Sequence, residues 1–84
     1  MLTCRKDDLI CREVDGNIVG LDLRTSRYFS LNDTGTFLWR QLEKGAEVDD
    51  LVSALAAEHS LDRSAAANDV DVFVTSLREQ DLLA

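Results

Sequence analysis

The chain has 84 residues, of which 16 are acidic and 9 basic, giving a formal net charge of −7. This length suits one domain, residues 1–84, with a modest core and little room for a deep active-site cleft. The negative charge repels phosphate backbones and argues against nucleic acid as a partner. No apolar run could cross a bilayer, and residues 1–8 lack the apolar stretch of a signal peptide, so we expect a cytoplasmic protein without a membrane partner.

Three strands are predicted in the first part of the chain, which is rich in branched and aromatic residues. The first covers residues 9–14, and Asp15-Gly16 after it is a strong hairpin signal, because a type I′ turn needs positive φ. The second strand covers residues 17–23 and the third residues 28–31. Strands joined by such short turns form an antiparallel meander, which leaves the third strand at an edge.

The second strand alternates apolar residues with others, which predicts one buried face. We expect Val19, Leu21 and Leu23 to form that face, because the three share one side of the strand. Gly20 lies on the opposite side, where its missing side chain allows a neighbour to approach closely.

Three helices follow. Asn32 is a good N-cap for the first, and Gly45 ends it. Apolar residues on several sides of this helix, Phe37 and Trp39 among them, indicate that it packs against more than one neighbour. The second helix is predicted over residues 48–58, whose apolar residues follow helical spacing throughout.

The third helix is predicted over residues 63–80, with Asp62 as its N-cap, and Leu82-Leu83 should fold back after it. Its expected buried stripe consists of Ala66, Val70, Phe73, Val74 and Leu77. The order of elements is therefore β-β-β-α-α-α, an α+β fold with a three-stranded antiparallel sheet followed by three helices.

The two cysteines, Cys4 and Cys11, are too few to form a metal cage. If the segment between them is extended, they lie roughly 20 Å apart, too far for a disulfide, and on opposite faces of a strand. We expect free thiols, one of them facing the core.

No catalytic constellation is visible, so we expect neither an enzyme, nor a bound metal, nor a cofactor. His59 is the only histidine and suits a surface position near a helix C-terminus. Asp33-Thr34-Gly35 spells the triplet of aspartic proteases, but here it opens an amphipathic helix, whereas the protease triplet lies in a loop between apolar strands. An N-cap and a first helical turn account for Asp33 completely.

Three stretches carry a resemblance to a known family. They are the hairpin DGNIVGLDL (residues 15–23), the strand RYFSLN (residues 27–32), and a helix with Gly35 followed by Trp39. Their order and spacing, together with the helices that follow, resemble the PqqD-like family over residues 8–83. The resemblance implies a winged-helix-like domain that recognises the leader segment of ribosomally made peptides, which other enzymes then modify.

The family's leader adds as an antiparallel strand to the edge of the third strand, in a groove whose other wall is the third helix. An uncovered edge strand suits this role, because its unpaired backbone groups can bind an added strand. The resemblance therefore assigns peptide binding to the strand and to one flank of the third helix. The assigned residues are Arg27, Tyr28, Phe29, Ser30, Leu31, Asp69, Val72, Phe73 and Ser76.

We choose the Asp69 and Ser76 flank because Val72 beyond it is an apolar residue that the core does not need. The flank with Asp71 and Arg78 stays open as the alternative. A surface valine is also ordinary, and Tyr28 could simply pack against a neighbouring strand.

Among members of the family, the chain looks most like the stand-alone proteins of lasso-peptide pathways. That setting implies two further partners, a cysteine-protease-like leader peptidase and a cyclase. The alternative setting is a PqqD-type chaperone that delivers its peptide to a radical SAM enzyme. A dimerisation or scaffold module using the same edge also stays open. A DNA-binding winged helix is disfavoured, because the predicted third helix is acidic rather than basic.

Overall fold

The computed structural model describes residues 1–84 and has the predicted order of elements. The strands form one antiparallel sheet in the order β1-β2-β3, so β3 lies at an edge. Asp15 and Gly16 both have positive φ, as the predicted type I′ hairpin requires. The elements are β1 (Leu9–Val14), β2 (Asn17–Asp22), β3 (Arg27–Ser30), α1 (Asp33–Glu43), α2 (Val48–His59) and α3 (Arg63–Glu79).

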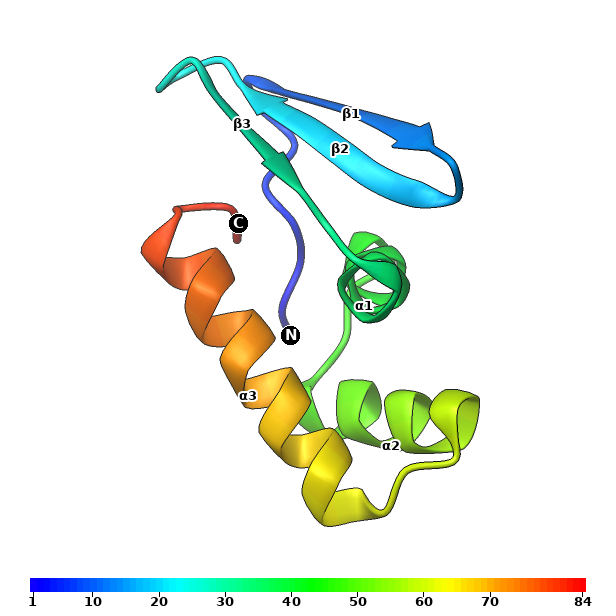
Figure 1. Ribbon diagram of the computed structural model, residues 1–84. Coiled ribbons are helices and arrows are strands. Elements are labelled where there is room, and N and C mark those ends of the chain that lie inside the picture. The colour runs from blue at the N-terminus through cyan, green and yellow to red at the C-terminus, as the bar shows by residue number, and fades with distance from the viewer.

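The core is built mainly by the three helices, together with Ile18 of β2, and Figure 1 shows α1 between the sheet and α2. Leu38, Trp39 and Leu42 of α1 are fully buried, which explains the wide apolar surface of this helix. The predicted stripe of α3 is also confirmed, since four of its residues are buried and Phe73 is partly buried against the core.

The predicted caps are present. Asn32 Oδ1 accepts a hydrogen bond of 2.8 Å from the Gly35 N–H, and Asp62 Oδ1 accepts one of 2.7 Å from the Ala65 N–H. Gly45 follows α1 with a φ of 85°. The aspartic-protease triplet therefore forms the first turn of a capped helix.

The prediction for the buried face of β2 is wrong. Ile18, Gly20 and Asp22 point into the protein, whereas Val19 and Leu21 are only half-buried on the outer face and Leu23 is exposed. The reason is Gly20, because a β-carbon built there would overlap the ring of Phe29. The Phe29 ring occupies the space where the side chain of residue 20 would lie, so this side of Gly20 faces the core. Because side chains alternate along a strand, Ile18 and Asp22 then point inward as well.

Residues before β1 and after α3 pair with each other, which confirms that Leu82-Leu83 folds back. Cys4 and Leu83 form an isolated antiparallel bridge, and the Ala84 N–H donates to the Thr3 carbonyl at 2.9 Å. Figure 1 shows this first segment running between the sheet and the helices, beside the end of the chain. The segment before β1 is thus paired with the residues that follow α3.

The expected separation of the cysteines is also wrong. Residues 5–8 turn instead of extending, with a φ of 55° at Asp8, and Cys4 and Cys11 line one cavity of about 160 Å³. Both are free thiols; Cys4 is buried and Cys11 exposed. Burial, followed by the nearby Glu43 carboxylate, raises the pKa of the Cys4 thiol to about 12 and also raises the pKa of Cys11.

No helix of the structure is both long enough and apolar enough to traverse a lipid bilayer.

Candidate functional site

Along the edge of β3 that faces away from β2, the backbone has N–H and C=O groups without a partner in the sheet. The Leu31 N–H donates to the Ile18 carbonyl at 2.8 Å, so Leu31 and, two residues earlier, Phe29 direct their backbone groups toward β2. Because successive residues alternate in an antiparallel ladder, Tyr28 and Ser30 direct their N–H and C=O groups away from the sheet. This edge therefore offers two donors and two acceptors to a further strand.

A large hollow lies between β3 and the end of α3. Its volume is about 550 Å³. One wall consists of β3 and the turn before it, and the other of Glu79, the last residue of α3, and the three residues that follow it. The lining residues are Asp22, Thr25, Arg27, Tyr28, Phe29, Glu79, Gln80, Asp81 and Leu82.

A second hollow of about 340 Å³ lies farther back along α3, next to the first turn of α1. Its lining residues are Asn32, Thr34, Gly35, Asp69, Val72, Phe73 and Ser76. The two hollows follow one another along the chain on both sides. On one side are residues 69–76 and then 79–82, and on the other are residues 22–29 and then 32–35. We call them together the β3–α3 groove.

The structure brings together the site residues expected from the sequence. Arg27, Tyr28 and Phe29 line the first hollow, and all four expected residues of α3 line the second. Ser30 is exposed and Leu31 half-buried; neither lines a hollow.

The alternative flank of α3 does not face the groove, since Asp71 and Arg78 line neither hollow. Val72 does line one and is 62% exposed, so the surface valine lies where a bound chain could cover it.

Sequence reasoning missed the walls formed by residues after α3, namely Gln80, Asp81 and Leu82. The repeated Leu82-Leu83 suggested a folded-back tail but did not say that the tail reaches the strand edge. The first turn of α1 was also missed. Asn32 was predicted only as the N-cap of this helix, and nothing in the sequence indicates that the first turn of α1 faces α3.

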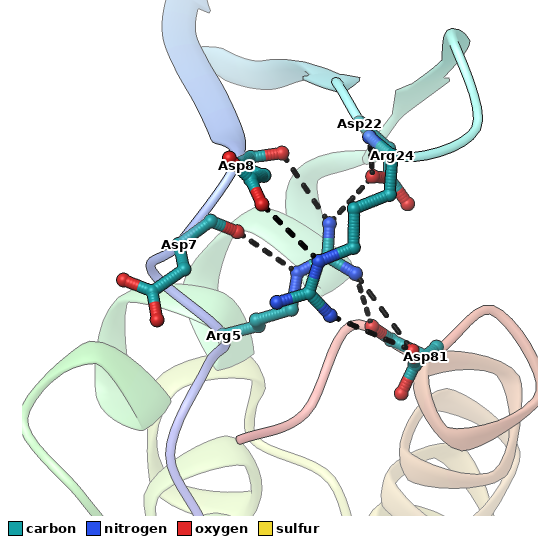
Figure 2. A network of polar contacts seen from close by, with 6 residues as sticks. All are labelled: Arg5, Asp7, Asp8, Asp22, Arg24 and Asp81. Carbon is teal, nitrogen blue, oxygen red and sulfur yellow. Dashed lines mark hydrogen bonds and ion pairs between the residues drawn. The ribbon is translucent and has the colours of Figure 1, made fainter.

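A buried ion pair lies beneath the larger hollow. Arg5 Nη2 is 2.5 Å from Asp22 Oδ1, although the two side chains are only 7% and 6% exposed. Figure 2 shows the Arg5 guanidinium between Asp22 and the backbone of Asp81. The hydrogen bond from Arg5 lowers the pKa of Asp22, and a further one from the Arg24 N–H acts in the same direction.

The outer face of the sheet, which points away from the helices, is unusually apolar. Sheets that face water on one side normally carry polar residues there. Here Tyr28 is 77% exposed, and Ile10 and Val14 are also exposed. The face forms a shallow hollow lined by Ile10, Arg12, Val14, Val19, Gly20, Leu21 and Tyr28.

No cluster of three or more His, Cys, Asp or Glu side chains could hold a metal ion. His59 lies outside the groove, with its ring nearly perpendicular to that of Phe37 at a centroid distance of 6.0 Å. What the groove offers is a free strand edge beside a partly apolar helix wall, which suits an extended peptide.

Comparison with known families gives a match over residues 17–83, most of the chain, to coenzyme PQQ synthesis protein D (PqqD). The chain belongs to the PqqD family. The resemblance noted in its hairpin, strand and first helix is thereby confirmed. No curated protein matches.

Two solved structures resemble this PqqD-family chain closely. One is described as TbiB1 in complex with the TbiA(β) leader peptide; it is 33% identical, with a TM-score of 0.85, over 93% of this chain and 91% of that one. The other is described as lasso peptide synthetase B1 complexed with the leader peptide. It is 29% identical, with a TM-score of 0.86, over 99% of this chain and 96% of that one.

Proposed function

We propose that this chain binds the leader segment of a ribosomally synthesised precursor peptide, in a lasso-peptide pathway, and performs no catalysis itself. The leader adds to β3 as a fourth, antiparallel strand and lies in the β3–α3 groove. The observation that carries this proposal is the free backbone of Tyr28 and Ser30 beside the groove. Both similar solved structures hold leader peptides, which supports the same class of ligand here.

The β3 edge and the α3 wall of the groove have different roles in binding. Backbone pairing along Tyr28 and Ser30 supplies affinity that depends little on the leader sequence. Side chains of alternate leader residues point toward α3, where Val72 and Phe73 give the smaller hollow its apolar part. We assign specificity to these contacts, together with Asp69 and Ser76 beside them.

The bound leader is presented to other proteins, which we identify as a leader peptidase of the cysteine-protease type and a cyclase, in the cytoplasm. The apolar outer face of the sheet supports a protein partner, because exposed apolar patches of this kind mark interaction surfaces. Delivery to a radical SAM enzyme, as for PqqD-type chaperones, is the alternative setting. Self-association through the same edge is the alternative use of β3.

The test titrates the TbiA(β) leader peptide, and the leader peptide of the second similar structure, into this protein while following calorimetry and molecular mass. Saturable binding at one peptide per chain, with the protein remaining monomeric in the complex, is the expected result. Binding of neither peptide contradicts the proposal. A dimer that dissociates when peptide is added identifies self-association through the edge as a competing state.

Strand addition is tested separately with Ser30→Pro, which removes an N–H of the free edge. Affinity should fall by at least about ten-fold, since one backbone hydrogen bond is lost and the proline ring disturbs its neighbours. The matched control is Glu13→Pro at the free edge of β1, where the ladder alternation also directs an N–H outward. That variant should bind the peptide as well as the wild type.

A further inference from the structure

Arg5 is a buried charge whose hydrogen bonds reach three parts of the chain. Besides the Asp22 carboxylate at the end of β2, it donates to the Asp81 carbonyl at 2.9 Å and to the Asp7 carbonyl at 3.1 Å. A longer bond of 3.4 Å reaches the Asp8 carbonyl. Figure 2 shows these acceptors arranged around one guanidinium. Burying a charge is costly unless it is paired and hydrogen-bonded, and Arg5 meets both conditions.

Two of the acceptors belong to opposite walls of the groove. Asp22 lies on the sheet side of the larger hollow, and Asp81 lies on the α3 side, directly beyond the end of that helix. A single planar guanidinium thus joins the two walls.

The backbone beside Arg5 supports the same connection. The Arg5 N–H donates to the Leu82 carbonyl at 2.9 Å, and the neighbouring Cys4 pairs with Leu83. At its other end α3 is joined to α2, where Arg63 bonds to Ser53 and Asp49. The end of α3 that faces β3 is therefore held to the sheet through residues 4–5 and the segment after the helix.

We infer that Arg5 is a positioning residue for the peptide groove, whose guanidinium fixes the width between β3 and the end of α3. This inference rests on the proposed function, since it makes leader affinity depend on a residue that the leader does not need to touch. An added strand needs both the β3 edge and the α3 wall at fixed distances. A groove that already has this width binds without first having to close.

Arginine is suited to this role, and lysine is not a substitute. The guanidinium has five N–H donors in a rigid plane, which lets it bond to the Asp22 carboxylate and the Asp81 carbonyl at once. A lysine ammonium keeps the charge opposite Asp22 but is a single point on a flexible stem. In Arg5→Lys the ion pair can form while the side-chain bond to the Asp81 carbonyl is lost.

The first measurement is the distance across the groove without peptide. Spin labels are attached at Val14→Cys and Arg78→Cys, both exposed positions outside the groove, in a protein whose exposed Cys11 is replaced by Ser. The distance between the two labels reports how α3 lies relative to the sheet. Arg5→Lys should broaden this distance distribution, and saturating TbiA(β) leader peptide should narrow it again. If about one peptide-free molecule in ten then has the groove width that binds the leader, leader affinity falls about ten-fold.

Arg24→Lys is the matched control. Arg24 belongs to the same network and also approaches Asp81, but it is half-exposed, and its side chain pairs with the Asp8 and Asp81 carboxylates. Its replacement should leave both the distance distribution and the affinity unchanged. If Arg5→Lys does not fold, the double variant Arg5→Met with Asp22→Leu takes its place, because paired apolar replacements of buried ion pairs are tolerated.

The outcomes separate the inference from the proposed function. A folded Arg5 variant with wild-type distances and wild-type affinity overturns the positioning role. So does a variant whose affinity falls without a change in distance, or whose distance changes while the affinity does not. A wild-type protein that binds neither leader peptide overturns the proposed function, and the spin-label distances still decide whether Arg5 sets the width.

Discussion

Phe29 lies directly over Gly20, on the face of the sheet that points toward α1. The same ring packs at a tilt against Trp39, with 5.7 Å between the ring centroids. Phe29 is also a wall of the larger hollow. One aromatic side chain thus joins the core to the groove.

Gly20→Ala should lower the free energy of unfolding by about 1–3 kcal/mol, because the added methyl group overlaps the Phe29 ring and forces it to move. Urea denaturation measures the change. Ser30→Ala, on the exposed edge, is the control and should stay within about 0.5 kcal/mol of the wild type. A Gly20→Ala protein as stable as the wild type would mean that the ring does not occupy this position.

Val72→Asp should weaken leader binding roughly ten-fold while leaving stability nearly unchanged, because it places a charge in the apolar part of the smaller hollow. Calorimetric titration with the TbiA(β) leader peptide measures the effect. Ala67→Asp adds the same charge at an exposed position of α3 outside the groove and should bind normally. Equal affinities for Val72→Asp and the wild type would move the site to the Asp71 and Arg78 flank.

Acid should remove part of the stability through Asp22. The Arg5 hydrogen bond lowers the pKa of Asp22 in the folded protein below its usual value of 3.8. The stability that Asp22 contributes is therefore fully present above the pKa that Asp22 has in the unfolded chain. It is lost as the pH falls through the pKa that Asp22 has in the folded protein. The difference in Tm between the wild type and Asp22→Asn should shrink as the pH is lowered from 7 toward 3.

Asp69→Asn, at an exposed groove residue, provides the control for the acid series and should differ little from the wild type in Tm at any pH. If the Tm difference between the wild type and Asp22→Asn is constant across this range, Asp22 does not carry the acid dependence.

The two thiols should react slowly with alkylating reagents in the native protein. With a pKa of about 12, Cys4 has a thiolate fraction on the order of one in ten thousand at pH 8, and it is also buried. In Cys11→Ser, iodoacetamide should label the protein only after urea unfolds it. Rapid labelling of that variant under native conditions would show that the cavity around Cys4 opens.

Most of the architecture could be predicted from the sequence because its signals are local. The Asp15-Gly16 turn, the caps Asn32 and Asp62, and the helical spacing of α2 and α3 each depend on neighbouring residues. The edge position of β3 then follows from short connections between the strands. The strand part of the candidate site was predictable for the same reason.

The errors concern contacts between distant residues. Alternation in β2 suggested the wrong buried face, because the outer face is also apolar and the deciding contact, Phe29 over Gly20, joins two strands. Arg5 lies 17 positions before Asp22 and looks like an ordinary charged residue of a flexible end. Nothing local indicates that it is buried, or that it links β2 to the end of α3.

Amide hydrogen exchange of Tyr28 and Ser30, followed by NMR with and without the TbiA(β) leader peptide, tests strand addition most directly. Both N–H groups point away from the sheet, so they should exchange quickly in the free protein and become protected when the leader pairs with them. The Cys11 and Glu13 amides at the β1 edge should not change. Peptide binding that leaves Tyr28 and Ser30 unprotected, or that protects the β1 edge instead, would contradict the account.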